Sequence, residues 1–346
     1  MLPPWLLAAC AVPIVLVLYK SINDGMFTGS TAVDELRSYL EKLEAANDMA
    51  EVFLNRMWDR ALEAPIEATA GRTNFTVITV DTDKPSDFAM LGPGNVAVIN
   101  VGAGQMWNSW YDKPRLYQKY LKKFAVDFPD RIVILADGYD TIFGGCSEDQ
   151  LLESFRKIRD VSQAKVVWGA ENCCFPWSDT CNWYGNFTQR QASSLQVFGM
   201  TESYGIYGDC RRCRDLEIPG YDSFCSSPPA YQHLNSGFLM GEASHVLSAV
   251  NLWVKLYNNF NETDPDQLVA SEALFNQPDL MTLDYSGRLV LTIGNIVETS
   301  IPRLLSIRNG TLYNHVTEAP QCFVHGAGPG KVFLAHVLKM LQSRVD

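Results

Sequence analysis

The sequence has little positive charge, no low-complexity tract and no collagen-like glycine period. Its 28 lysines and arginines face 39 aspartates and glutamates, which gives a net charge of −11. A protein that tracks nucleic-acid phosphates needs the opposite balance, so we expect no nucleic-acid partner. Hydrophobic residues make up 47% of the 346 positions. Disorder and fibre formation are therefore excluded for most of the chain, and the length predicts two domains or one large α/β domain.

The N-terminus carries an uncharged apolar run from Leu2 to Tyr19. Its length falls within the roughly 17–25 residues that span a bilayer. No lysine or arginine precedes the run, which is atypical of a cleaved signal, although the small residues at 8–11 leave cleavage and secretion open. Lys20 and Arg37 follow the run and favour a cytosolic position for that side, but two charges are too few to decide. We expect a membrane signal anchor over 1–24, with the rest of the chain in the secretory lumen.

The cysteines favour an oxidising compartment. Cys10 lies in the apolar run, and eight more follow, six of them within 173–225. An even number beyond the anchor is typical of disulfides, whose pairing the sequence leaves open. The alternative is a zinc site at Cys210 and Cys213, but no histidine lies in this region before His233. Disulfides are the better interpretation.

Four glycosylation sequons support the same compartment. They begin at Asn74, Asn186, Asn261 and Asn309. Asn74 is the first residue of a strand-like apolar run, where a glycan would interfere with packing. Together with the anchor and the cysteines, the sequons predict a single-pass type II protein of the endoplasmic reticulum or Golgi lumen.

A helical stem is predicted over 25–72. Apolar residues recur from Val33 to Ala61 at alternating three- and four-residue steps, and Asn47 takes an a position in this pattern. Such a seam is typical of a parallel coiled-coil dimer, so a homodimer through the stem is one interpretation. The other is an amphipathic helix packed on its own domain. Pro65 ends the segment.

From Phe75 onward, strands alternate with helices. Strands are predicted at 75–80, 96–101, 131–136 and 165–168, and helices at 113–124 and 148–161. This alternation predicts an α/β fold with a mostly parallel sheet flanked by helices, whose ligands lie beyond the carboxyl ends of the strands.

Two carboxylates follow the predicted 131–136 strand directly, in Asp137-Gly-Tyr-Asp140. Because they are three residues apart in a turn, both can converge on one cation, and hard oxygen ligands suit Mg²⁺ or Mn²⁺ with a diphosphate completing the shell. We expect this turn to face solvent. The alternative is an ordinary surface turn.

His325 ends a strand-like triplet and opens a glycine-rich loop. An imidazole beside carboxylates favours Mn²⁺ over Mg²⁺. Glycines such as Gly328 allow close backbone approach to a phosphate, and Lys331 could neutralise its charge.

The chain resembles the glycosyltransferase domain of the procollagen-lysine hydroxylases, also called the lysyl hydroxylase or collagen glycosyltransferase family. Eight motifs carry this resemblance, in the family's order, over about 75–340. They are 75–82, 102–107, 113–116, 136–143, 169–176, 234–238, 264–267 and 324–329. The resemblance implies a GT-A (Rossmann-like) domain over 73–346 that uses Mn²⁺ and a UDP-sugar donor to glycosylate collagen hydroxylysine.

The resemblance also implies roles for individual residues. The implied metal ligands are Asp137, Asp140 and His325. The implied nucleotide contacts are Val80, Thr82, Trp107, Lys113 and Tyr139, and the glycine-rich loop adds Gly328 and Lys331 as candidate phosphate contacts. The implied residues near the donor sugar and the transfer step are Asp266, Asp264 and Asn235.

The chain departs from the family pattern around the sugar. Ala327 stands where the family has asparagine, and Phe175 stands where it has tryptophan. Leu116 stands where the family can have another aromatic residue, and Pro265 interrupts the acidic run. No histidine has an acidic residue two positions later, so the iron site of the hydroxylase part is missing. We expect a hexosyltransferase without hydroxylase activity. The alternatives are a non-catalytic module that binds a UDP-sugar or glycan, and a transferase acting on cell-surface polysaccharide.

Overall fold

A computed structural model describes residues 74–82, 98–171, 231, 233–294, 301–315 and 317–342. The predicted anchor, the stem, Asn186 and Phe175 lie outside this part of the chain. The six cysteines within 173–225 lie outside it as well, so the zinc alternative at Cys210 is not tested. No helix in the described ranges is long and apolar enough to cross a membrane.

A six-stranded sheet forms the centre of the fold, in the order β2-β1-β3-β6-β5-β7. Five strands run in one direction, and β6 runs against its neighbours β3 and β5. The predicted α/β fold is therefore confirmed, with a mixed sheet in which one inner strand is reversed. The bounds are β1 Phe75–Thr79, β2 Val98–Asn100, β3 Ile132–Ala136, β5 Val166–Glu171, β6 His233–Glu242 and β7 Met281–Leu283.

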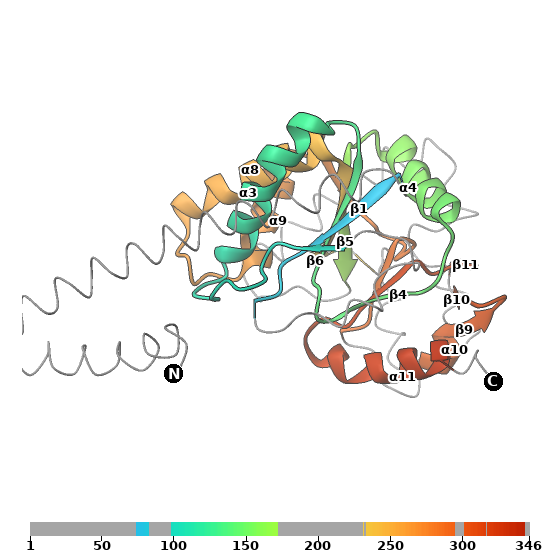
Figure 1. Ribbon diagram of the computed structural model, residues 1–346. Helices are drawn as coiled ribbons and strands as arrows, with labels where there is room; N and C mark the ends of the chain where they lie inside the picture. The colour runs from blue at the N-terminus through green and yellow to red at the C-terminus, as the bar shows by residue number, and fades with distance from the viewer. Residues whose placement is uncertain are drawn as a thin grey trace, which may run out of the picture. The chain divides into compact units, whose positions relative to one another are not determined.

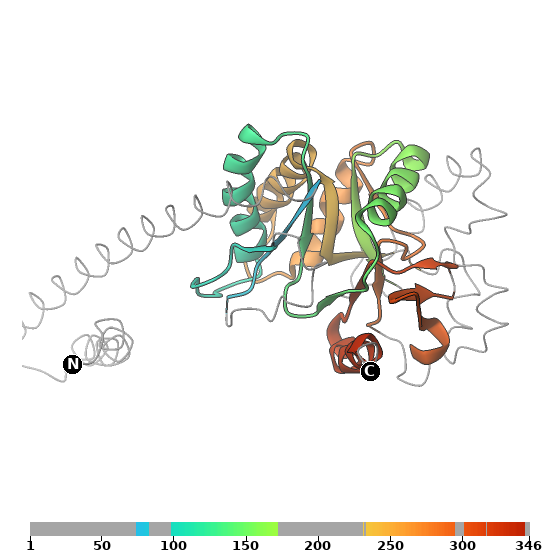
Figure 2. The same ribbon diagram turned by 45° about the vertical axis from the view of Figure 1, so that its right-hand side comes forward.

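Helices cover both faces of this sheet. In Figure 2, α3 (Asp112–Asp127) and α8 (Ala243–Leu256) lie on one side of the strands, and α4 (Glu148–Ser162) lies on the other. α3 and α8 pack side by side, and α9 (Asp266–Asn276) packs against α8 and β6 (Figure 1). A short 3-10 turn, η2 (Tyr257–Asn259), follows α8. Because both faces are covered, the strands read as continuous apolar runs.

One hydrophobic core cluster lies between the central sheet and α4. β1 and β3 are rich in β-branched residues, which fit a pleated strand packed on both faces. Aromatic rings from distant segments fill the space between strands, and Phe323 contacts both Phe143 and Phe238 at centroid distances of 5.4 and 5.3 Å. This core fixes the strand ends that carry the polar residues described below.

A second, three-stranded sheet lies beside the central one. In it, β12 (Phe323–His325) pairs antiparallel with β4 (Thr141–Phe143) and parallel with β8 (Val290–Thr292). The predicted strand-like triplet before His325 is thus a strand. The register places Thr141 and Thr292 on either side of His325.

The remaining C-terminal elements form a hairpin region and a helix. β9 (Leu305–Arg308), β10 (Thr311–Asn314) and β11 (Ala319–Pro320) form an antiparallel sheet. The short helix α10 (Ile301–Leu304) precedes it. The 3-10 turn η4 (Gly328–Gly330) leads into α11 (Lys331–Gln342), which lies beside this region in Figure 1.

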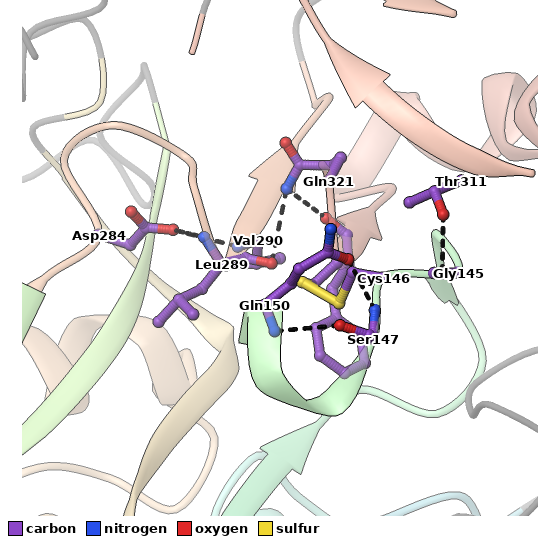
Figure 3. Close-up of a disulfide and its surroundings, with 11 residues drawn as sticks. Gly145, Cys146, Ser147, Gln150, Asp284, Leu289, Val290, Thr311 and Gln321 are labelled. Atoms are coloured by element: carbon purple, nitrogen blue, oxygen red, sulfur yellow. Dashed lines mark hydrogen bonds between the residues drawn. A yellow bond between two sulfur atoms is a disulfide. The ribbon is translucent and has the colours of Figure 1, made fainter. Parts of the chain in front are cut away.

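A disulfide joins Cys146 to Cys322 across 176 residues of sequence. Cys146 precedes Ser147, which caps α4 together with Gln150, and Cys322 precedes β12 (Figure 3). Both sulfur-bearing side chains are buried. The link therefore fastens the chain that leaves β4 to the strand that carries His325. The predicted presence of disulfides is confirmed for this pair.

Polar side chains around the disulfide hold the same strands. The Gln321 side-chain amide donates to the carbonyl of Phe323 at 3.0 Å, and the buried Asp284 carboxylate accepts from the backbone N–H groups of Leu289 and Val290 at 2.6 and 3.1 Å (Figure 3). These bonds satisfy backbone groups at the start of β8, next to β12. The second sheet is thus fixed at the end opposite His325.

Candidate active site

Asp137, Asp140 and His325 come together at the edge where β3 ends. The two carboxylates lie in the turn between β3 and β4, and the β4–β12 pairing brings His325 beside that turn. His325 Nε2 lies 3.3 Å from Asp140 Oδ1 and 3.7 Å from Asp137 Oδ2. One ligand atom from each residue falls within 4.8 Å of the others. Three groups far apart in the sequence thus form one cluster.

Backbone hydrogen bonds fix this cluster. The Gly326 N–H donates to the Asp140 carbonyl at 2.8 Å, and the Asp137 N–H donates to the Gly237 carbonyl at 3.0 Å. The first bond ties the glycine-rich loop to the acidic turn, and the second ties that turn to β6. The positions of the ligands are therefore set by backbone as well as by side-chain packing.

The residues of the cluster fit a divalent cation. Two carboxylates and one imidazole are donors that Mn²⁺ accepts readily. Asp140 Oδ1 and both His325 ring nitrogens are buried, and none has a hydrogen-bond partner of good geometry among the described residues. Buried polar atoms without partners are costly, so each points to a group that completes it. A metal ion bound here would satisfy Asp140 Oδ1 and His325 Nε2.

The acidic turn is less exposed than its sequence predicts. Asp137 is partly exposed, but only 5% of Asp140 is accessible. The expectation of a solvent-facing turn is wrong for Asp140, because β12 and the loop after it cover that side chain. Tyr139 does face solvent, with 68% of its surface accessible.

Lys113 lies in the same site and is 5% exposed. Its ammonium group lies 2.6 Å from Asp137 Oδ1 and 2.9 Å from Asp266 Oδ2. Burial lowers the pKa of Lys113, but the two carboxylates outweigh burial and hold the pKa well above its ordinary value. Lys113 is therefore not a solvated lysine on a helix face, and it stays charged in the site.

Lys331 supplies a second positive charge. Its ammonium group lies 2.8 Å from Asp140 Oδ2, at the start of α11. Burial raises the pKa of Asp140, but His325 and Lys331 outweigh it and hold the pKa at about 2. Burial lowers the pKa of His325, and the Asp140 and Asp137 carboxylates raise it above its ordinary value. Without a cation, the two ammonium groups offset part of the carboxylate charge, and the carboxylates favour the protonated form of His325.

Gly328 lies close in sequence to this charge cluster, in η4. It is exposed, with a φ of +50° that favours glycine, and a Cβ there would meet nothing within 4 Å. The loop therefore offers open space beside its backbone.

Asp266 and Asp264 have different surroundings. Asp266 is buried at the first turn of α9 and pairs with Lys113. Asp264 accepts the Asn261 N–H at 2.7 Å and so closes the loop before α9. Pro265, which interrupts the acidic run, is the N-cap residue of α9. Asp266 therefore belongs to the charge cluster, whereas the Asp264 side chain shapes a turn.

Asn235 belongs to a buried polar group that also contains Glu171 and Gln267. The Asn235 side-chain amide donates to Glu171 Oε2 at 3.1 Å and to Gln267 Oε1 at 3.4 Å, and the Gln267 amide donates to Glu171 Oε1. Burial raises the pKa of Glu171 to about 7, against the lowering effect of these hydrogen bonds and of His325. Glu171 thus holds its proton near neutral pH.

Glu171 was not among the candidate residues that the sequence indicates. A signal for Glu171 was present in the sequence. Glu171 is the last residue of β5, and β5 ends at the same sheet edge as β3. A carboxylate at the carboxyl end of a buried strand follows the same rule that identifies Asp137.

The implied nucleotide contacts lie on the neighbouring strand ends. Thr79 pairs with Ala136, so Val80 follows β1 beside the position where Asp137 follows β3. Thr82 is half-buried two residues later. Trp107, in the loop before α3, is 40% exposed and meets Trp110 edge-on at a centroid distance of 5.6 Å.

Besides Pro265, two further departures from the family pattern lie in the described part. Leu116 is buried in α3, on the face of that helix that packs into the fold. Ala327 is half-buried, and its carbonyl is 3.1 Å from the position that a Cβ on Gly294 would take. Leu116 thus contributes to packing, while Ala327 lies in the loop between His325 and Lys331.

Comparison with known proteins identifies the type of domain. The family model described as the PLOD GT domain matches residues 73–199. The match supports a PLOD-type glycosyltransferase domain in this part of the chain. The resemblance to that family is therefore confirmed, and the matched segment contains Asp137, Asp140, Lys113 and Glu171. His325, Asp266 and Asn235 lie beyond it.

Other comparisons are more distant. A search among curated proteins gives no match. Among solved structures, the chain is similar to a glycosyltransferase involved in the glycosylation of the major capsid of PBCV-1. That similarity has 13% sequence identity and a TM-score of 0.42, and it covers 77% of this chain and 98% of the other.

Proposed function

We propose that the chain is a metal-dependent GT-A glycosyltransferase that moves a hexose from a UDP-sugar to a hydroxyl group. The acceptor we propose is hydroxylysine or galactosyl-hydroxylysine of a collagen-like protein. The observation that carries this proposal is the cluster of Asp137, Asp140 and His325, with two buried or half-buried lysines beside it.

Asp137, Asp140 and His325 would hold Mn²⁺ or Mg²⁺, which when bound neutralises diphosphate charge as UDP leaves. Three protein ligands leave about three octahedral positions for phosphate oxygens and water. Lys113 and Lys331 would turn from the carboxylates toward the phosphates and stabilise the same charge. Gly328 would allow the diphosphate close to the backbone.

The groups around the sugar would orient the donor and the acceptor. Asp266 is tied to Lys113, and Asn235 is tied to Glu171, so the two pairs form a polar wall built by α3, α9, β5 and β6. Hydrogen-bonding groups of this kind suit sugar hydroxyls. Trp107 and Tyr139 are the exposed rings that we expect to contact the base.

One alternative is a non-catalytic module that binds a UDP-sugar or a glycan, which Ala327 and Phe175 favour. Another is a transferase that modifies cell-surface polysaccharide. The buried metal cluster argues for turnover rather than binding alone. An acceptor screen with collagen peptides and polysaccharide fragments separates the two transferase proposals.

We further propose that residues 1–24 anchor the chain as a type II membrane protein of the endoplasmic reticulum or Golgi. The catalytic domain would then face the lumen, and the stem helix would pair with a second copy. The lumenal location agrees with the disulfide between Cys146 and Cys322, since disulfides persist in oxidising compartments.

The function is tested by metal-dependent release of UDP from a panel of UDP-sugars. Asp140→Asn keeps the shape of the side chain and removes its charge. We expect it to lower turnover at saturating donor about a hundredfold or more, because a metal supplies several kcal/mol of charge stabilisation. Asp160→Asn, on the exposed side of α4, is the control. Wild-type turnover in Asp140→Asn would contradict the assignment.

A further inference from the structure

Gly237 is buried against the His325 ring, in the middle of β6. An ideal Cβ on Gly237 would lie 2.6 Å from His325 Nε2 and 2.9 Å from Nδ1, and closer still to Cε1. Contacts below about 3.0 Å essentially never occur for a real Cβ, so the ring occupies the space that any other side chain at 237 would need. The Cε1 edge of the His325 imidazole thus approaches a strand that has no side chain at that point.

Backbone conformation does not require glycine here. Gly237 lies in β6 where the pairing with β5 shifts register, but its φ is outside the positive range in which several other glycines of this chain fall. The space filled by the His325 ring is therefore the reason for glycine at this position.

Gly237 also contacts the acidic turn. Its carbonyl accepts the Asp137 N–H at 3.0 Å, and its own N–H donates to Asn235 Oδ1 at 3.0 Å. One residue of β6 thus fixes the backbone of Asp137, receives the ring of His325 and is itself held by Asn235. Gly237 has no side chain, so its backbone makes all of these contacts.

We infer that Gly237 is a positioning residue for the metal site, which sets the distance between His325 and the two carboxylates. This inference rests on the proposed metal-dependent function. A Cβ at 237 would push the imidazole out of reach of the cation, because the backbone of Gly237 is held by its hydrogen bonds with Asp137 and Asn235. His325 is the part that can shift, so the substitution acts on ligand geometry more than on the fold.

The first test is calorimetry of Mn²⁺ binding, alone and with UDP. We expect Gly237→Ala to weaken Mn²⁺ binding about ten- to a hundredfold, the range typical of residues that orient metal ligands. The matched control is Gly241→Ala, four residues along the same strand. A Cβ there would be 3.0 Å from the Lys165 carbonyl and 3.0 Å from Val246, so the site is tight, though less crowded than position 237, and it is distant from the cluster. We expect this control to lower the melting temperature and leave Mn²⁺ affinity unchanged.

The second test needs no metal. Melting temperatures are compared for Gly237→Ala, His325→Ala and the double variant in the presence of a chelator. If the added methyl meets the imidazole, its destabilising effect disappears when His325 is already alanine, and the two changes are non-additive. The double variant also folds if Gly237→Ala alone does not, which keeps the inference testable.

The outcomes separate the inference from the proposed function. Wild-type Mn²⁺ affinity in Gly237→Ala, or the same loss of melting temperature with and without His325, would overturn the positioning role. Failure of the unaltered protein to bind Mn²⁺ would instead overturn the proposed function, while the melting comparison would still decide whether the ring lies against Gly237.

Discussion

At the scale of single residues, the site is a balance of buried charges. The site contains three carboxylates, two ammonium groups and one imidazole, which direct contacts link to one another. The sequence indicates Asp137, Asp140 and His325 because each follows a strand. It could not indicate that Lys113 is buried between Asp137 and Asp266, since that contact depends on how α3 and α9 pack.

Lys113 competes with a cation for Asp137 and should bind phosphate once that cation is present. We therefore expect Lys113→Ala to bind Mn²⁺ alone at least as tightly as the unaltered protein, and to bind UDP about tenfold or more weakly. A lost charge-assisted hydrogen bond of roughly 1.5–3 kcal/mol gives that factor. Calorimetry with Mn²⁺ alone and then with UDP measures both effects. Lys157→Ala, in an exposed ion pair on α4, is the control, and an unchanged UDP affinity in Lys113→Ala would contradict this role.

The raised pKa of Glu171 predicts that the free energy of unfolding depends on pH. Its pKa rises from 4.5 to about 7 on folding, chiefly by burial. Between those pH values the unfolded chain has released a proton that the folded chain keeps, so stability falls as pH rises through this window. The fall attributable to Glu171 is roughly 3 kcal/mol.

Glu171→Gln should remove that fall. The measurement is the difference in unfolding free energy between the variant and the unaltered protein at pH 5 and pH 8, in metal-free buffer. Taking the difference cancels the titration of the groups that do not interact with position 171. An equal pH slope in both proteins would show that Glu171 titrates normally.

At the scale of elements, the ends of the β-strands determine where the candidate catalytic residues lie. The sequence predicted β1, β2, β3 and β5 and the helices α3 and α4, because their periodicity is strong. It did not predict β6, whose first half reads Leu-Asn-Ser-Gly and lacks alternation. Pairing with β3 and β5 on both sides makes this segment a strand, and such long-range pairing leaves no local pattern.

The disulfide makes a prediction for the second sheet. Cys146→Ala with Cys322→Ala removes the link between the β4–α4 connection and β12. We expect a loss of about 2–5 kcal/mol in stability, as for native disulfides in other domains, and a weaker Mn²⁺ affinity, because β12 carries His325. Chemical denaturation of the oxidised proteins and calorimetry measure the two effects. An unchanged Mn²⁺ affinity beside a lower stability would show that the sheet holds His325 without the link.

At the scale of the whole molecule, the site needs both parts of the domain. The segment matched by the family model ends at residue 199, yet His325 and Asp266 complete the cluster from beyond it. The resemblance extended to about residue 340 and so indicated His325. The geometry that makes the cluster, above all the return of β12 beside β4, is a property of the fold and not of any one motif.

The proposed lumenal location predicts N-glycans. Asn261 is exposed in the loop before α9, and Asn309 is exposed at the turn between β9 and β10, with a φ of 48°. We expect the protein expressed in eukaryotic cells to shift on glycosidase treatment, and Asn261→Gln with Asn309→Gln to reduce that shift. An unmodified protein that is digested by protease outside intact microsomes would contradict the location.

The central claim is that Asp137, Asp140 and His325 bind one divalent cation together with UDP. The direct measurement is an anomalous difference map from crystals grown with Mn²⁺ and UDP. The account predicts one strong peak in contact with an oxygen of each carboxylate, with His325 Nε2 and with the diphosphate, and it predicts that Lys113 has left Asp137 for the phosphate. A map without a peak among these three side chains, with UDP bound and Lys113 still on Asp137, would contradict it.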